Sequence, residues 1–207
     1  IPISRNNFDK NQFPKLKKVT HFVHLAGIGS ESIEQKFQNV NIETTKTVIE
    51  LCKKNRIKKI IYFSGLGVSK NSRSSYFISK FNAEQLIKNS GLQYTIFRPS
   101  YIVGKDDYLT KNISKQISKK QVLIPGSGKF LLQPISILDV CSCINVALNS
   151  SKFSNKIIDL VGPNKISFEN LIKQSIPDNV KTKKITLESA YKQALNDINF
   201  EYGVEDL

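Results

Sequence analysis

KIIYFSGLGVSKNSRSSYFISKFNAEQLIKNSGLQYTIF, residues 59–97, carries the pattern that decides the fold. Its start, Lys59–Ser64, is a short apolar run that stops at Gly65, which is typical of a buried strand. Tyr76–Ser90 follows with apolar residues at helical spacing and a glycine stop at position 91. Leu92–Phe97 is again strand-like. A strand, a helix and a strand in this order predict a right-handed crossover between parallel strands.

The same alternation continues on both sides of this stretch. A strand is expected at Val19–Leu25 and a helix at Ile42–Asn55, whose closing lysines complement the helix dipole. Later segments predict helices at 109–119, 137–149 and 167–175 and strands at 122–124 and 157–161. The fold class is therefore α/β, a doubly wound parallel sheet covered on both faces.

The domain organisation follows from where this alternation weakens. Residues 1–161 are expected to form the main domain, and residues 162–207 a small C-terminal lobe that does not fold independently. The segment after Pro177 is polar and weakly patterned, so the sequence predicts only a substrate-facing lobe or a tail there. No internal repeat is apparent.

The chain is strongly basic, with 31 lysine and arginine residues against 17 aspartate and glutamate residues. The lysines occur as scattered pairs without interleaved aromatic residues, so the sequence does not predict a nucleic-acid partner. They are interpreted as solvated helix ends and loops, on a surface that suits a phosphorylated cofactor or substrate.

Several composition features narrow the class of protein. Cys52, Cys141 and Cys143 lack the spacing of a metal site and are expected to be reduced helix residues. His21 and His24 alternate on the first predicted strand and are expected to be core or sheet-end histidines. No apolar run is long enough to span a membrane, and no export signal opens the chain, so we expect a cytoplasmic protein. Methionine is absent even at position 1, from which we expect a truncated chain.

The residues that are candidates for ligand binding and catalysis lie where predicted strands end. In open parallel sheets, ligands bind outside the carboxyl ends of the strands. Three such ends carry glycine or proline: Ala26–Gly29, Ser64–Gly67 and Arg98–Ser100. Tyr76 and Lys80 follow the second of them, four residues apart, so they share one helix face. A nearby ammonium lowers the pKa of a phenol, which suits general acid/base chemistry at a carbonyl or hydroxyl.

These motifs together resemble the extended or atypical short-chain dehydrogenases, within the NAD-dependent epimerase/dehydratase superfamily. The resemblance rests on HLAG at 24–27, NIETT at 41–45, Ser64 before a glycine loop, Tyr76 and Lys80 with the spacing YxxxK, and RPS at 98–100. GSGKF at 126–130, with Gln133–Pro134 and Asp139–Val140, is similar to the branch of the complex I accessory subunit. The resemblance covers most of the chain and implies a Rossmann-like fold that binds NADP or NAD.

The family pattern implies roles for individual residues. Tyr76 would be the acid/base, Lys80 would bond the nicotinamide ribose and tune Tyr76, and Ser64 would lie beside the nicotinamide. Asn41 would be a structural or relay residue. The remaining cofactor-lining positions would be Ala26, Gly27 and Pro99. In this family the helix bearing the Tyr–Lys pair commonly joins a dimer interface, which implies a homodimer here.

The sequence also departs from the family pattern. Gly65 stands where sugar-nucleotide epimerases usually have a second hydroxyl, and Thr44 replaces the glycine of NVxGT. The phosphate-binding GxxGxxG is not found, so we expect that the first strand-turn-helix unit is missing from the chain. Arg5, after a strand expected at Ile1–Ser4, would either meet a 2′-phosphate and favour NADP or be solvated.

Two functions remain open at this point. One is an NAD(P)-dependent oxidoreductase or epimerase that acts on a small hydroxyl or carbonyl substrate, such as a nucleotide sugar or a quinone-like molecule. The other is an NAD(P)-binding structural or regulatory protein that has lost turnover, an alternative motivated by Gly65 and by the complex-I-like motifs.

Overall fold

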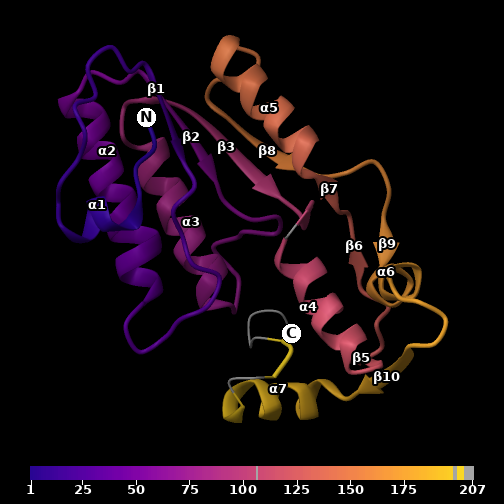
Figure 1. Cartoon of the computed structure of the whole chain (residues 1–207). Coiled ribbons are helices and arrows are strands. Elements are labelled where there is room, and N and C mark those ends of the chain that lie inside the picture. Colours follow the sequence, from indigo (N-terminus) through magenta and orange to yellow (C-terminus); the bar gives the residue numbers. More distant parts are fainter. Residues whose placement is uncertain (106, 198–199, 203–207) are drawn as a thin grey trace. The chain divides into compact units, whose positions relative to one another are not determined.

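A four-stranded sheet in the order β1-β2-β3-β8 joins three strands within residues 21–99 to a later strand at residues 156–160 (Figure 1). The computed structural model describes residues 1–105, 107–197 and 200–202. The strands of the sheet are β1 (His21–His24), β2 (Lys59–Phe63), β3 (Gln93–Pro99) and β8 (Lys156–Leu160). β1, β2 and β3 are parallel, and His21 is in register with Lys59, which in turn is in register with Gln93. The predicted parallel sheet is confirmed.

Helices cover both faces of this sheet (Figure 1). α2 (Thr44–Lys54) and α3 (Ser75–Lys88) pack on one face through apolar side chains spaced three or four residues apart, among them Val48 and Ile87. These side chains form one core with Ile60, Tyr62 and Ile96 of the strands. The other face carries the end of α5 (Ile137–Asn149), whose Ala147 carbonyl accepts a hydrogen bond of 2.7 Å from the buried Lys59 ammonium.

Two short helices were not expected from the sequence. The predicted strand at Ile1–Ser4 is wrong: these residues have no regular structure, and α1 (Arg5–Asp9) begins directly after them. The Ser4 amide donates to Asn7 Oδ1 at 2.8 Å, a capping contact that favours a helix start over an extended strand. A π-helix, η1 (Gln38–Glu43), precedes α2.

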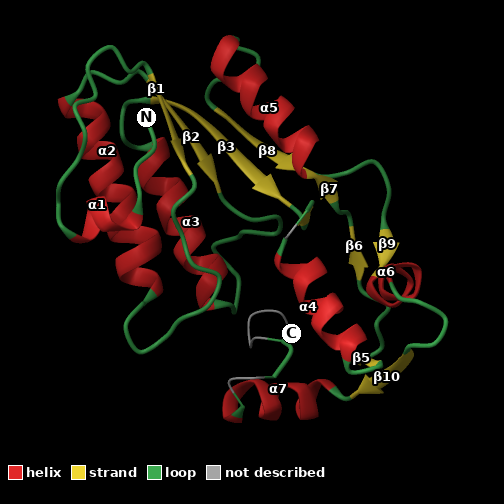
Figure 2. Cartoon of the chain, viewed as in Figure 1, coloured by secondary structure: helices red, strands yellow, loops and turns green. Residues whose placement is uncertain are grey.

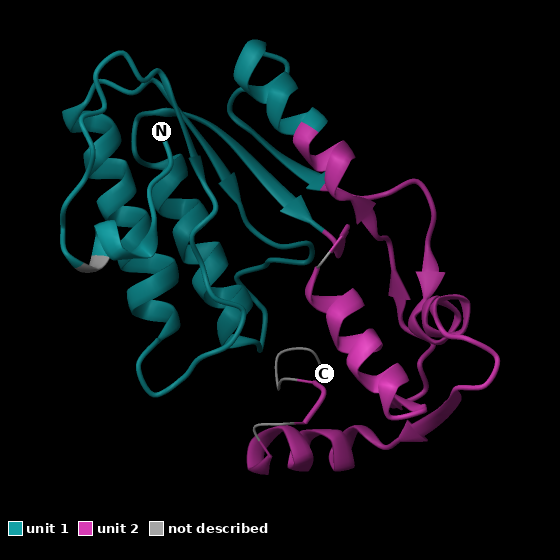
Figure 3. Ribbon diagram, in the orientation of Figure 1, with its two compact units in different colours: residues 1–99, 142–159 teal, residues 100–141, 160–207 magenta. Residues whose placement is uncertain are grey.

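The chain divides into two compact units, each built from two segments (Figure 3). Unit 1 comprises residues 1–99 and 142–159, and unit 2 comprises residues 100–141 and 160–207. The third crossing between the units, after residue 159, lies close to the predicted domain boundary after residue 161. The division into domains predicted from the sequence stays a prediction.

Unit 2 is a mixed α/β assembly of short elements (Figure 2). Its longer elements are α4 (Tyr108–Ser118), β5 (Gln121–Pro125), α6 (Phe168–Ser175), β10 (Lys181–Ile185) and α7 (Leu187–Asn196). The two-residue strands pair as β4 (Ile102–Val103) with β7 (Ile135–Ser136) and β6 (Leu131–Leu132) with β9 (Ile166–Ser167). The segment after Pro177 is thus a strand and a helix, because β10 pairs in parallel with β5 and α7 is capped by Thr186.

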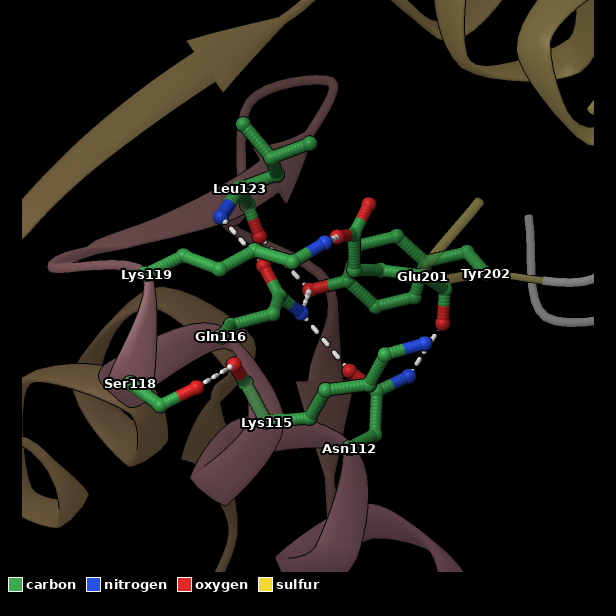
Figure 4. A network of polar contacts seen from close by, with 8 residues as sticks. All are labelled: Asn112, Lys115, Gln116, Ser118, Lys119, Leu123, Glu201 and Tyr202. Atoms are coloured by element: carbon green, nitrogen blue, oxygen red, sulfur yellow. Dashed lines mark hydrogen bonds and ion pairs between the residues drawn. The ribbon is translucent and has the colours of Figure 1, made fainter. Parts of the chain in front are cut away.

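Residues close to the carboxyl terminus are tied to α4 and β5 by a polar network (Figure 4). The Tyr202 hydroxyl donates to the Leu123 carbonyl at 2.6 Å, and Gln116 accepts a bond of 2.8 Å from the Leu123 amide. Lys119 forms an ion pair with Glu201 at 2.5 Å. Tyr202 is buried in the core of unit 2 beside Phe168, so this segment is part of that core.

Candidate active site

The candidate residues of unit 1 gather at the carboxyl ends of β1, β2 and β3. The chain leaves β2 at Phe63, and the Ser64 amide donates to the Phe97 carbonyl at 2.8 Å. The Leu66 amide then donates to the Pro99 carbonyl at 2.9 Å. These two bonds hold the loop of Ser64 and Gly65 against the end of β3, which accounts for the position of Pro99.

α3 brings Tyr76 and Lys80 to this loop. The helix begins after Ser74, whose side chain accepts a hydrogen bond from the Phe77 amide. A Cβ atom added at Gly65 would lie 3.5 Å from Tyr76 Oη and within 3.7 Å of the side chains of Val68 and Phe77, so glycine leaves a methyl-sized space beside the phenol. The Tyr76 ring contacts Phe37, with 5.9 Å between the ring centroids. The half-buried phenol therefore lies between Phe37, just before η1, and the glycine loop.

Lys80 is almost fully buried beneath the same loop. Its Nζ donates to the Phe63 carbonyl at 2.7 Å and lies 4.5 Å from the centroid of the Tyr62 ring. A Cβ added at Gly27 would approach Nζ to 3.5 Å. Burial lowers the pKa of Lys80 to about 8, and the nearby carboxylate of Glu84 opposes that shift. The ammonium is thus held where its charge is only moderately stable at neutral pH.

Asn41 joins the loop after β1 to α3. Its Oδ1 accepts from the Ile28 amide at 2.9 Å, and its Nδ2 donates to the Ile28 carbonyl at 3.2 Å and to Ser79 Oγ at 2.9 Å. Asn41 lies within the π-helix η1, a type of turn that is frequent at functional sites. A Cβ added at Gly27 would lie 3.2 Å from Asn41 Oδ1, so the loop passes very close to this amide. These contacts tie the loop after β1 to α3 through Asn41.

The buried His24 is linked to Asn41 through Thr45. His24 Nε2 lies 2.9 Å from Thr45 Oγ1, whose hydroxyl donates to the Asn41 carbonyl at 2.7 Å. Because the hydroxyl proton is used on Asn41, His24 carries its proton on Nε2 and donates it to Thr45. Burial, and next the charge of Lys80, lowers the pKa of His24 to about 3. The imidazole is therefore neutral, as expected for a core histidine.

Two buried hydroxyls have no hydrogen-bond partner among the described residues: Ser64 Oγ and Tyr62 Oη. Buried hydroxyls are normally bonded, and an exception at a site indicates that a partner is supplied from elsewhere. Ser64 is adjacent to Gly65, next to the space in front of Tyr76. A nicotinamide with its ribose fits this set, since Ser64, Tyr76 and Lys80 could bond it and the glycines leave room for its flat ring.

The structure brings most of the predicted residues together and leaves one apart. Ser64, Tyr76, Lys80, Gly27 and Asn41 are linked by the contacts given above, and Ala26 is adjacent to Gly27 in the same loop. Arg5, in contrast, is exposed on α1, and no contact joins it to this set in the described residues.

Sequence reasoning missed the ion pair of Glu84 and Arg98, which is part of the site's support. Glu84 lies one helical turn after Lys80, and that spacing could have placed Glu84 near the site, although not its pairing with Arg98. Within the described ranges, no three histidine, cysteine or acidic side chains are grouped as metal ligands.

A parallel sheet with glycine loops after β1 and β2, and with a Tyr–Lys pair at its carboxyl end, defines a dinucleotide-binding α/β protein. The model of the NAD(P)H-binding family matches residues 9–125, and the chain belongs to that family. NAD(P) is therefore its cofactor class.

Curated relatives are distant and longer than this chain. Prestalk A differentiation protein A of Dictyostelium discoideum is 25% identical over 152 residues, which are 72% of this chain and 47% of that protein. The mitochondrial NADH dehydrogenase (ubiquinone) 1 alpha subcomplex subunit 9 of Arabidopsis thaliana is 28% identical over 151 residues, which are 72% of this chain and 38% of that protein. The chain spans less than half the length of either relative.

A solved structure shows the same fold. UDP-glucuronic acid 4-epimerase from Bacillus cereus, in complex with UDP-glucuronic acid and NAD, matches with a TM-score of 0.67 and 20% identity. The match covers 83% of this chain and 64% of that chain. Together with the family match, this structure confirms the Rossmann-like fold class and the NAD(P)-binding family that the resemblance implies. The chain is similar to an epimerase in fold and to a complex I subunit in sequence.

Proposed function

We propose that this protein is an NAD(P)-dependent oxidoreductase or epimerase that acts on a hydroxyl or carbonyl group through Tyr76, with Lys80 and Ser64. The single observation that carries the proposal is the arrangement around Gly65. The buried Ser64 Oγ has no partner in the described chain, and Tyr76 Oη lies next to the space that a side chain at position 65 would fill. In this proposal, a substrate oxygen binds beside Gly65 and contacts both hydroxyls.

The chemistry divides between the cofactor and the chain. A bound nicotinamide supplies or accepts the hydride at the substrate carbon. Tyr76 would take the proton from the substrate hydroxyl during oxidation and return it during reduction. Ser64 would donate a hydrogen bond to the same oxygen. Lys80, bonded to the Phe63 carbonyl through one proton, would use its other protons to hold the ribose and its charge to stabilise the phenolate.

The substrate class is the finer part of this proposal. The structurally similar epimerase was solved with UDP-glucuronic acid, and the name of the Arabidopsis relative includes ubiquinone. We infer a small substrate of one of these kinds, a nucleotide sugar or a quinone. The role of Arg5 in favouring NADP, the homodimer and the cytoplasmic location likewise stay predictions, and the relative's name includes the mitochondrion.

A second candidate function is a non-catalytic NAD(P)-binding protein. Gly65 favours it, because no side chain at this position can polarise a substrate carbonyl beside Ser64. The match to a complex I subunit favours it as well. In that case the Tyr76 and Lys80 contacts would serve cofactor binding and stability without turnover.

The two candidates separate in one set of measurements. NADPH and NADH are titrated by fluorescence against wild type, Tyr76→Phe and Tyr191→Phe, the last being an exposed tyrosine of α7. Turnover is then measured with UDP-glucuronic acid and with a short-chain ubiquinone. If the first proposal is right, Tyr76→Phe lowers turnover by at least about 100-fold and changes cofactor affinity little. Tyr191→Phe should behave as wild type.

Three outcomes decide between the candidates. Binding without turnover that depends on Tyr76, on either substrate, would overturn the catalytic proposal and support the second candidate. Turnover that Tyr76→Phe leaves intact would contradict the assigned acid/base. Absence of binding to either nucleotide would contradict both candidates.

A further inference from the structure

The opposite edge of the unit 1 sheet, where its strands begin, gathers cations. Backbone bonds join the strand starts: the Lys58 amide donates to Thr20 O at 2.9 Å, and the Gln93 amide donates to Lys58 O at 3.2 Å. The Asn155 amide, just before β8, donates to Tyr94 O at 2.6 Å. The four segments that enter the strands therefore lie side by side, and Figure 1 shows β1, β2 and β3 starting together.

These four entry segments are residues 11–20, 51–58, 86–92 and 149–156. They contain no aspartate or glutamate. They carry ten exposed cations, named here the basic edge: Lys15, Lys17, Lys18, Lys53, Lys54, Arg56, Lys58, Lys88, Lys152 and Lys156. None of the ten forms an ion pair with another described residue. The basic edge is therefore a surface whose positive charge is not balanced by ion pairs.

The excess charge of the protein belongs to the unit that bears this edge. Unit 1 contains 19 lysine and arginine residues against 7 aspartate and glutamate residues, whereas unit 2 contains 12 against 10. A general basic composition would have charged both units alike. The asymmetry indicates that the charge serves a surface of unit 1.

Helix capping accounts for only part of the basic edge. Lys53, Lys54 and Lys88 lie in the last turns of α2 and α3, where cations complement the helix dipole. The other seven lie outside those turns. Two of them, Lys18 and Arg56, adopt left-handed backbone conformations with φ of 64° and 55°, where glycine or asparagine is favoured. Cations therefore occupy two positions whose backbone conformation favours glycine or asparagine.

The surroundings of the cations indicate the kind of partner. None of the large apolar side chains that are strongly exposed in the described chain lies in the entry segments, so the edge lacks the apolar centre of a protein interface. Phe13 and Phe153 are half-buried against Phe8 and Phe97, so no exposed ring is available to stack a base. A diffuse polyanionic plane needs neither feature.

We propose that unit 1 docks through its basic edge on a membrane surface rich in anionic phospholipid. The contact is electrostatic and peripheral: it adds lysine–headgroup attraction within a Debye length and inserts no apolar group. The proposal does not depend on Tyr76 or on turnover, since the basic edge and the candidate active site lie at opposite ends of the strands.

The test is a vesicle co-sedimentation series with the whole chain. Wild type is compared with the edge variant Lys17→Gln, Lys54→Gln, Lys58→Gln and Lys152→Gln, made together. The control combines Lys111→Gln, Lys165→Gln, Lys181→Gln and Lys183→Gln in unit 2, which removes the same charge from exposed lysines. Vesicles contain phosphatidylcholine with phosphatidylserine or phosphatidylcholine alone, and thermal melting verifies that each variant is folded.

We expect wild type and the control to bind the phosphatidylserine vesicles, and the edge variant to bind at least about tenfold more weakly. Raised salt should abolish binding. Equal losses in the edge and control variants would overturn the proposal in favour of non-specific charge. Failure to bind either vesicle would also overturn it, as would a preference for duplex DNA added as a competitor over the vesicles.

Discussion

The guanidinium of Arg98 donates two hydrogen bonds to the carboxylate of Glu84, from Nε to Oε1 at 2.9 Å and from Nη2 to Oε2 at 2.7 Å. Glu84 is fully buried on α3, one turn beyond Lys80, and Arg98 lies at the end of β3 next to Pro99. This bidentate pair therefore ties the helix that carries Tyr76 and Lys80 to the strand end on which the Ser64 loop rests.

Breaking this ion pair should destabilise the fold. Glu84→Gln leaves the guanidinium without its charge partner, and we expect the free energy of unfolding to fall by about 3–5 kcal/mol in urea denaturation. The control is Glu43→Gln, which removes an exposed pair with Lys46 and should leave the urea midpoint unchanged. Equal, small effects of the two substitutions would show that the Glu84 pair does not support the fold.

The buried ammonium of Lys80 predicts a stability change at alkaline pH. Its pKa is lowered to about 8 in the folded chain, against an ordinary value of 10.5. Between these values the unfolded chain holds a proton that the folded chain has released, so stability rises with pH. Relative to Lys80→Met, the wild type should gain about 3 kcal/mol across this interval, as measured by denaturation at several pH values. A difference in stability between the two proteins that stays constant with pH would contradict the lowered pKa of Lys80.

The buried His24 predicts that the stability of the fold changes at acid pH. Its pKa is lowered from 6.5 to about 3, so the stability that depends on the neutral imidazole is complete above pH 6.5 and is lost as the pH falls toward 3. His24→Gln should remove up to about 5 kcal/mol of this acid dependence. His21→Gln, on the same strand but more exposed, should change the acid melting profile little. Similar profiles for both variants would reject the prediction.

A steric test applies to unit 2. A Cβ added at Gly162 would lie 1.9 Å from the Pro134 carbonyl oxygen, a contact that requires the backbone to move. We expect Gly162→Ala to lower the free energy of unfolding by more than about 3 kcal/mol. Gly29→Ala is the matched control, because no atom lies within 4 Å of its Cβ position. Unchanged stability in Gly162→Ala would show that this approach is looser than described.

Much of unit 1 could be predicted because its elements are long and periodic. β2, α3 and β3 follow directly from residues 59–97, since apolar runs and a 3.6-residue stripe are set by burial against one sheet. Tyr76 and Lys80 could be paired in advance because i,i+4 spacing fixes a shared helix face. Ser64 and Gly65 could be placed because strand ends meet at one edge.

Other features depend on contacts that periodicity does not encode. β10, read KTKKI, has no alternation because it is an exposed strand whose backbone pairs with β5. Ile1–Ser4 looks strand-like, yet the cap at Ser4 starts a helix after it. Arg98 and Glu84 are 14 residues apart, and only the packing of α3 against β3 brings them together.

The π-helix at Gln38–Glu43 predicts how homologues of different length should differ in this segment. Each turn with i→i+5 bonding contains one residue more than an α-helical turn, so the segment has the length of a helix with a single-residue insertion. Loss of one residue there would restore α-helical turns and rotate the preceding residues by about 100° relative to α2. Homologues that differ by one residue in this segment would therefore differ in how Asn41 meets Ile28, even if every motif on either side were identical.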